Sequence, residues 1–199
     1  MSGAGLRIGV LGSGKGSNCE AILTGCRQGK IPGEVVLVLS DVADSGILAL
    51  AGKYDVPARV VTPKPEEPLI AALKDAGVEL VALAGYMRVL KEQFLREFAG
   101  RIVNVHPSLL PAFPGLRAWE QALQYGARLT GATVHFVTEG AVDAGPVILQ
   151  HPVPVFANDT AESLHARIQI AEHTLYPEAI RLFAEGKLRV EGRRVRILE

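Results

Sequence analysis

The chain has 199 residues, in which 21 lysines and arginines balance 21 aspartates and glutamates, so its formal net charge is zero. That balance argues against nucleic-acid and polybasic membrane-surface partners. Hydrophobic residues make up 48% of the chain, which is enough for a substantial core. We therefore expect residues 1–199 to form a single compact domain.

The two cysteines indicate the cellular compartment. Cys19 and Cys26 are seven residues apart in a segment with a helical pattern. On one helix they would lie roughly 10 Å apart along the axis, which is too far for a disulfide. Two unpaired thiols, no signal-peptide pattern and no apolar run near the roughly 20 residues of a membrane span predict a cytoplasmic protein. Monomer and homodimer both remain open.

Strand and helix patterns alternate through the first half of the chain. Short apolar runs, typical of strands buried on both faces, occur at 7–11, 34–40, 58–61, 79–85 and 101–106. Helical patterns lie between them, at 17–28, 45–54, 66–76 and 91–98. Strands joined by helical crossovers predict an α/β fold with an open, doubly wound, mainly parallel sheet of Rossmann-like type.

The regular alternation of strand and helix patterns ends after residue 106. Segments 132–137 and 146–155 predict antiparallel strands, and the prolines of the second segment restrict it to a sheet edge. A long helix is expected over 160–185, where Pro177 predicts a kink or a break. The basic stretch 189–196 predicts a C-terminal hairpin with a polar side.

The stretch GVLGSGKGSN (9–18) resembles two nucleotide-binding motifs. A triphosphate loop that starts at Gly9 would destroy the first strand, although Asp41 could supply its acidic magnesium ligand. A dinucleotide fingerprint fits Gly12-x-Gly14 better, but it lacks the third glycine. What remains is a glycine turn at the start of a helix, which suits one phosphate or is a plain tight turn. The expected phosphate contacts are Gly14, Gly16, Ser17 and Asn18.

Asn104 and His106 form a polar pair at the end of a predicted strand, alternating with Val103 and Val105. The alternation places both polar side chains on one face of the sheet. Open α/β sheets bind ligands at the carboxyl ends of their strands. An asparagine amide can donate to a carbonyl oxygen, and a histidine can donate to it or carry a proton. The pair therefore indicates acyl transfer directly to a substrate nucleophile.

Asp143, in the glycine-flanked loop DAGPV (143–147), is the candidate third partner. If this loop folds over the strand ends, its carboxylate could raise the pKa of His106 and hold a water. As a plain turn residue it would do neither. His135, on an alternating strand, is interpreted as structural.

Six segments occur in a fixed order along nearly the whole chain: SGKGSN (13–18), AGYMRVL (84–90), NVHPSLLPAFPG (104–115), TVHFV (133–137), DAGPVI (143–148) and QIAEHTLYP (169–177). In this combination the chain resembles the phosphoribosylglycinamide formyltransferases of purine synthesis. The combination is highly specific, whereas Asn-x-His and D-x-G-P recur separately across folate-dependent formyl enzymes.

The resemblance implies transfer of a formyl group from the cosubstrate 10-formyltetrahydrofolate to the amine of glycinamide ribonucleotide, without a metal. It implies three catalytic residues: Asn104, His106 and Asp143. It implies ribonucleotide contacts from Gly14, Lys15, Gly16, Ser17, Asn18 and Glu172. It implies folate contacts from Met87, Arg88, Val89, Leu90 and Asn104.

The sequence departs from the family pattern at several places. Lys15 stands where asparagine or arginine is frequent, and segment 62–73 is shorter and lacks an arginine found in some members. One extra residue separates His135 from Asp143. Arg117 and Trp119 replace two frequent histidines.

Three other interpretations compete with the transformylase. A formyltetrahydrofolate deformylase would carry an additional N-terminal regulatory domain, for which 199 residues leave no room. A methionyl-tRNA formyltransferase would need a further C-terminal domain and a basic surface. A non-catalytic nucleotide-binding module would bury Asn104 and His106 in internal hydrogen bonds, away from any cleft.

Overall fold

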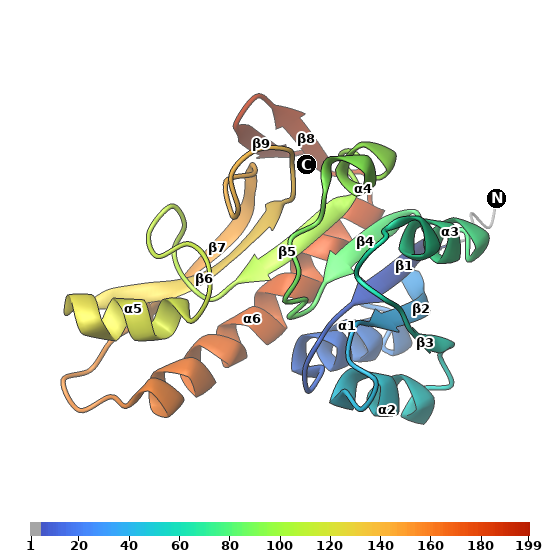
Figure 1. Cartoon of the computed structure of the whole chain (residues 1–199). Coiled ribbons are helices and arrows are strands. Elements are labelled where there is room, and N and C mark those ends of the chain that lie inside the picture. Colours follow the sequence, from blue (N-terminus) through green and yellow to red (C-terminus); the bar gives the residue numbers. More distant parts are fainter. Residues whose placement is uncertain (1–4) are drawn as a thin grey trace.

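The computed structural model describes residues 5–199, which form one nine-stranded sheet with helices on both faces (Figure 1). The strands are β1 (Leu6–Leu11), β2 (Gly33–Ser40), β3 (Ala58–Val60), β4 (Leu80–Leu83), β5 (Ile102–His106), β6 (Leu129–Phe136), β7 (Val147–Pro154), β8 (Leu188–Glu191) and β9 (Arg194–Ile197). The helices are α1 (Ser17–Arg27), α2 (Gly46–Lys53), α3 (Glu67–Asp75), α4 (Glu92–Glu97), α5 (Ala118–Tyr125) and α6 (Ala161–Ala184).

The strand order is β3-β2-β1-β4-β5-β6-β7-β9-β8. Strands β1 to β5 are parallel, and β6 runs antiparallel to both β5 and β7. The predicted doubly wound sheet with antiparallel strands in the C-terminal half is thus confirmed. The chain crosses from one side of β1 to the other between β3 and β4, which is the arrangement that opens a binding crevice at the carboxyl ends of the strands.

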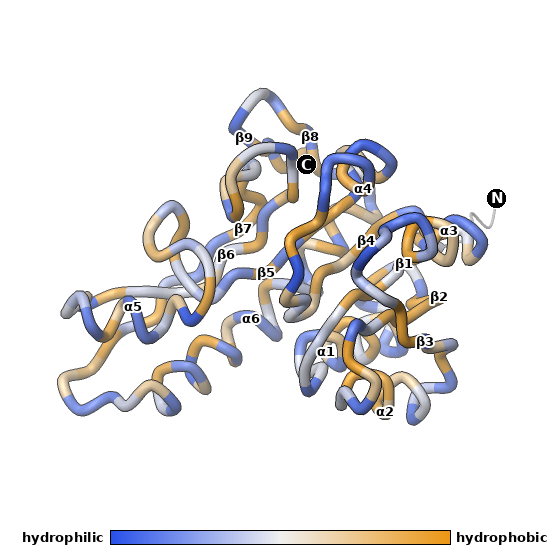
Figure 2. Tube along the Cα trace, in the orientation of Figure 1, coloured by the Kyte–Doolittle hydropathy of each residue, from blue (hydrophilic) through white to orange (hydrophobic). Residues whose placement is uncertain are grey.

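Two apolar layers hold most of the helices on the sheet, and a third cluster packs α5 and the first half of α6 against β6 and β7. One layer packs α1, α2 and α6 against strand residues such as Ile8, Val10 and Val103. The other layer packs α3 and α4 against strand residues that point to the opposite face of the sheet, such as Leu11 and Leu83. Figure 2 shows the apolar strands between helices that each carry polar residues on part of their surface. Successive side chains of a strand point to opposite faces of the sheet, so alternate apolar residues of each strand pack into different layers.

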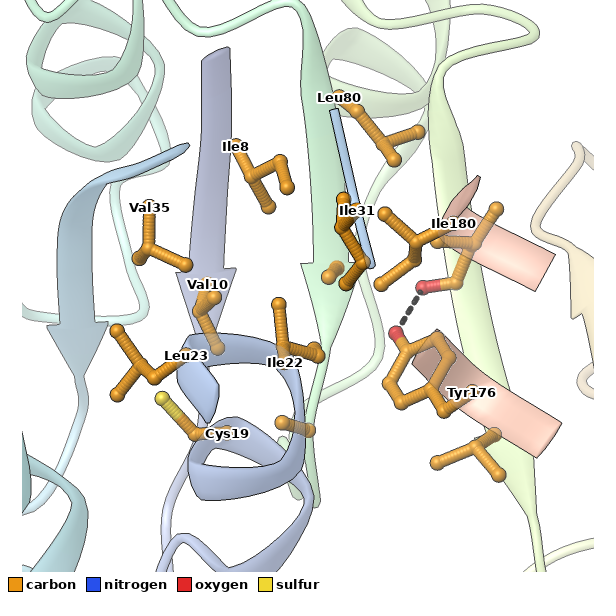
Figure 3. Close-up of a cluster of buried hydrophobic side chains, with 14 of the residues drawn as sticks. Ile8, Val10, Cys19, Ile22, Leu23, Ile31, Val35, Leu80, Tyr176 and Ile180 are labelled. Carbon is orange, nitrogen blue, oxygen red and sulfur yellow. Dashed lines mark hydrogen bonds between the residues drawn. The ribbon is translucent and has the colours of Figure 1, made fainter. Parts of the chain in front are cut away.

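Tyr176 of α6 lies fully buried within the first layer (Figure 3). Its hydroxyl group lies 3.0 Å from the carbonyl oxygens of both Leu83, the last residue of β4, and Val103 of β5. A buried phenol needs such an acceptor, because an unpaired hydroxyl in an apolar core is costly. Tyr176 therefore holds α6 against β4 and β5.

Of the kink or break predicted at Pro177, the break does not occur. Helix α6 continues from Ala161 to Ala184 through the proline, and its N-cap is Thr160, whose side chain accepts from the backbone N–H of Ser163. Proline removes one backbone donor. The residues on either side of it, including Tyr176 and Ala179, are buried against the sheet, and this packing stabilises the helix across the proline.

Helix α5 was not predicted. It begins after Arg117 and ends at Gly126, whose left-handed conformation suits a glycine helix end. The sheet-edge position predicted for β7 is wrong, since β7 lies between β6 and β9, but it pairs with β9 only at Val147 and Arg194, so its prolines lie where it has no second partner strand. Within residues 5–199 no helix is both long and apolar enough to cross a membrane.

Candidate active site

Asn104 and His106 lie at the carboxyl end of β5, on the opposite face from Val103 and Val105. This is the arrangement that the alternation in the sequence predicts. Two loops meet at this strand end, one after β5 and one after β6, because the backbone N–H of Gly115 donates to Asp143 Oδ2 at 2.8 Å. The loops bring Asp143 beside the polar pair.

His106 makes contacts through both ring nitrogens. Its Nδ1 lies 3.3 Å from Asp143 Oδ2, and its Nε2 lies 2.9 Å from the carbonyl oxygen of Phe113. Burial lowers the pKa of His106 below its ordinary value, and this outweighs the opposite influence of the Asp143 carboxylate. The expected influence of Asp143 on the pKa of His106 therefore has the predicted sign, but burial is the larger influence because His106 is only 4% exposed.

Asp143 has a left-handed backbone, with φ of 57°. Burial disfavours its ionised form, but the backbone hydrogen bond from Gly115 and the two neighbouring histidines outweigh burial and hold its pKa below the ordinary value. The extra residue in this loop does not displace the carboxylate from His106. Gly145 accommodates the loop, since a Cβ there would lie 1.7 Å from the carbonyl oxygen of Phe136.

His135 belongs to the same cluster, although the sequence suggested only a structural role. It pairs directly with Asn104 across the β5–β6 ladder. Its Nε2 lies 3.3 Å from Asn104 Nδ2 and 3.7 Å from Asp143 Oδ1. The alternation in TVHFV already places His135 on one face of a strand. To predict that it lies beside Asn104 one must also know that β6 pairs antiparallel with β5.

The glycine loop after β1 has the geometry of a helix start. Gly16 is the N-cap of α1 with φ of 89°, and a Cβ there would lie 3.0 Å from the backbone of Ile47. Gly14 and Lys15 are exposed. Because the first turn of a helix leaves its amides without intrahelical acceptors, the N–H groups of Ser17 and Asn18 suit an anion.

Asn18 and Glu172 come together from α1 and α6, although 154 positions separate them in the sequence. Asn18 Nδ2 donates to Glu172 Oε2 at 2.8 Å. Burial raises the pKa of Glu172 to about 7, against the opposite influence of the Asn18 amide. Glu172 is only 4% exposed, so the Asn18 amide is the partner of a buried carboxyl group.

The segment 85–90 after β4 divides into exposed and buried side chains. Met87 and Val89 are 62% and 72% exposed, which is unusual for large apolar residues and suits contact with a ligand. Leu90 is buried in the layer with α3, so its side chain belongs to the core. Arg88 Nε donates to Asp41 Oδ2 at 2.6 Å.

A non-catalytic nucleotide-binding module would bury both Asn104 and His106 in internal hydrogen bonds. His106 is buried in this way, whereas Asn104 is half-buried. A cavity of about 210 Å³ adjoins the cluster, and Asp143, Pro114 and Arg193 are among its lining residues. Burial of His106 alone therefore does not separate enzyme from module.

The formyl transferase family matches residues 6–180 of this chain. Together with the fold and the Asn-x-His strand end, this match defines the class of protein as a formyl transferase. The curated phosphoribosylglycinamide formyltransferase of Escherichia coli (strain K12) is 41% identical over 192 residues, which cover 93% of this chain and 90% of that protein. The chain belongs to the phosphoribosylglycinamide formyltransferase family.

Solved structures show the same relationship. The chain is similar to glycinamide ribonucleotide transformylase 1 from Symbiobacterium toebii, with a TM-score of 0.96, 54% identity and coverage of 100% of this chain and 96% of that chain. A formyltetrahydrofolate deformylase from Pseudomonas syringae has a TM-score of 0.91 and 27% identity, and the match covers 100% of this chain and 67% of that chain.

The chain also matches a part of larger proteins. Two trifunctional purine biosynthetic proteins adenosine-3, from Drosophila pseudoobscura pseudoobscura and Bos taurus, are 44% and 41% identical to it. Each match covers 92% of this chain, but the matched part is only 14% of the first relative and 19% of the second. The chain therefore corresponds to only a small part of each of these relatives.

Proposed function

We propose that the protein transfers the formyl group of 10-formyltetrahydrofolate to the amine of glycinamide ribonucleotide. The observation that carries the proposal is the cluster of Asn104, His106 and Asp143 at the end of β5, in a chain of this family. The cluster combines an amide donor, an imidazole and a carboxylate, which is the equipment of acyl transfer without a protein nucleophile.

In the proposed reaction the amine nitrogen bonds to the formyl carbon, and the bond from that carbon to N10 of the folate breaks. One proton moves from the amine to N10, so the products are the formylated ribonucleotide and tetrahydrofolate. Asn104 donates to the formyl oxygen as negative charge develops on it. Asp143 orients His106 through Nδ1 and holds a water for the proton transfer.

His106 reaches the formyl oxygen only after a local exchange. Its Nε2 contacts the carbonyl oxygen of Phe113, a residue with φ of 53°. Left-handed backbone at a bulky residue stores strain, which is typical of functional loops. Substrate binding replaces the Phe113 carbonyl with the formyl oxygen as the partner of Nε2.

The two substrates take opposite sides of the strand end. The start of α1, with Gly14, Lys15, Gly16, Ser17 and Asn18, binds the phosphate of the ribonucleotide. Glu172 accepts hydrogen bonds from the ribose hydroxyls. The folate ring lies against the segment 87–90, where Met87 and Val89 are exposed.

A deformylase would direct water onto the same formyl group, and the similarity to the Pseudomonas syringae protein makes it the relevant alternative. The test incubates the protein with 10-formyltetrahydrofolate, with and without glycinamide ribonucleotide, and follows both tetrahydrofolate and formylated ribonucleotide. We expect folate turnover only with the ribonucleotide, matched mole for mole by product. Turnover that ignores the ribonucleotide would establish the deformylase, and binding without turnover would establish the module.

A further inference from the structure

Asp41 follows β2 directly, at the same edge of the sheet as the glycine loop and the segment 85–90. Its Oδ1 accepts from Ser13 Oγ at 2.5 Å, and its Oδ2 accepts from Arg88 Nε at 2.6 Å. One carboxylate therefore contacts the loop after β1 through one oxygen and the loop after β4 through the other.

Ser13 connects the same two loops a second time. Its hydroxyl oxygen accepts the backbone N–H of Met87 at 3.0 Å, and its own backbone N–H donates to the carbonyl oxygen of Gly85 at 3.1 Å. Since Ser13 Oγ donates its only proton to Asp41, its lone pairs remain for Met87. The carboxylate thus sets the direction of the whole hydrogen-bond chain.

The charges in this chain are unequally exposed. The Asp41 side chain is 1% exposed, whereas the Arg88 side chain is 54% exposed. Burial disfavours the ionised carboxylate, but the hydrogen bonds from Ser13 and Arg88 outweigh burial and keep the pKa of Asp41 below its ordinary value. The buried carboxylate accepts from one hydroxyl group and one guanidinium group, and these bonds hold Ser13 and Arg88 in place. Loss of the carboxylate would leave both donors without their partner.

We propose that Asp41 is a positioning residue that joins the glycine loop to the segment 85–90, so that each loop keeps the conformation that binds its substrate. This inference deepens the proposed function and rests on its assignment of the two substrates to these loops. In this role Asp41 acts through Ser13 on the phosphate side and through Arg88 and Met87 on the folate side.

The test compares Asp41→Asn, which keeps the shape and removes the charge, with Asp75→Asn at the exposed end of α3 as a matched control. In Asp41→Asn we expect KM for both substrates to rise about 10-fold, with kcat changed less than about 3-fold. Ser13→Ala should reproduce the rise in both KM values, and the double variant should be no worse than Asp41→Asn, because both changes break one chain of hydrogen bonds. Asp75→Asn should behave as the unchanged protein.

Hydrogen–deuterium exchange gives a readout that does not depend on activity. Asp41→Asn should speed exchange in residues 12–18 and in residues 85–90 together, while α3 exchanges as before. Faster exchange in one segment only, or normal KM values in a folded but less stable Asp41→Asn, would overturn the inference. Ser13→Ala decides the matter if Asp41→Asn does not fold. If the unchanged protein lacks transfer activity, the proposed function fails, and the exchange experiment still tests the connection between the loops.

Discussion

Asn104 of β5 and His135 of β6 are directly opposed in the antiparallel ladder, with 3.3 Å between Asn104 Nδ2 and His135 Nε2. His135 Nδ1 lies 2.9 Å from the carbonyl oxygen of Phe136, which can only accept. Nδ1 therefore carries the proton, and Nε2 accepts from the Asn104 amide. This orients the Asn104 side chain in the candidate active site.

His135→Ala should lower kcat by roughly 10-fold or more while leaving KM for the ribonucleotide within about 2-fold, because the Asn104 amide loses the partner that orients it. Steady-state kinetics with both substrates measure this. His151→Ala, an exposed histidine on β7, is the control and should have normal kinetics. A normal kcat in folded His135→Ala would show that Asn104 is oriented without it.

The titration of His106 should follow from its two opposing influences. Burial places the pKa of His106 below 6.5, and the Asp143 carboxylate raises it from a still lower value. Asp143→Asn removes only the second influence, so the pKa of His106 should fall further. The ring-proton shifts of His106 in NMR spectra, recorded from pH 4 to pH 8, measure both values.

Asp44→Asn, in the exposed turn after β2, is the control for this titration and should leave the His106 curve unchanged. An upward movement of the His106 pKa in Asp143→Asn would mean that the carboxylate does not act on the ring through charge. In that case the 3.3 Å contact between the two side chains would serve orientation alone.

Much of the fold was predictable because each strand of the parallel half is an apolar run between helices with polar surfaces. The pair of Asn104 and His106 was predictable for the same reason, since alternation alone decides which side chains share a face. The family resemblance assigned Asn18 and Glu172 separately to the ribonucleotide, but their mutual contact was not predicted, because no local pattern connects α1 with α6.

Other features depend on tertiary packing and could not be predicted from local patterns. His135 enters the cluster through strand order rather than through its own neighbours in the sequence. Helix α6 passes Pro177 because its flanking residues are buried, a stabilisation that propensity does not include. Asp41 was considered only as a magnesium ligand, whereas its position beside Ser13 and Arg88 depends on the side-by-side placement of β1, β2 and β4.

Tyr176→Phe should destabilise the protein by about 1–3 kcal/mol, because it removes the hydroxyl that contacts Leu83 and Val103 and leaves buried carbonyl oxygens with one donor fewer. Urea unfolding followed by circular dichroism measures the change. Tyr125→Phe, at an 81% exposed position, is the control and should lie within about 0.5 kcal/mol of the unchanged protein. Equal stability of the two variants would mean that the buried hydroxyl contributes no net stability.

Glu172→Gln should stabilise the protein more at pH 8 than at pH 5. The folded protein holds the carboxyl proton up to a pKa of about 7, against an ordinary value of 4.5, so it binds more protons than the unfolded chain between these values. Its stability therefore falls as pH rises through this window, and the penalty stays constant above it. Glutamine carries no charge, and its side-chain oxygen can still accept from Asn18.

The difference between Glu172→Gln and the unchanged protein should grow by up to the order of 3 kcal/mol between pH 5 and pH 8. Urea unfolding at both pH values measures it without any substrate, so the result does not depend on the proposed function. Glu67→Gln, on the exposed first turn of α3, should show the same stability difference at both pH values. A pH-independent difference for Glu172→Gln would mean that Glu172 is already ionised in the folded protein at pH 5.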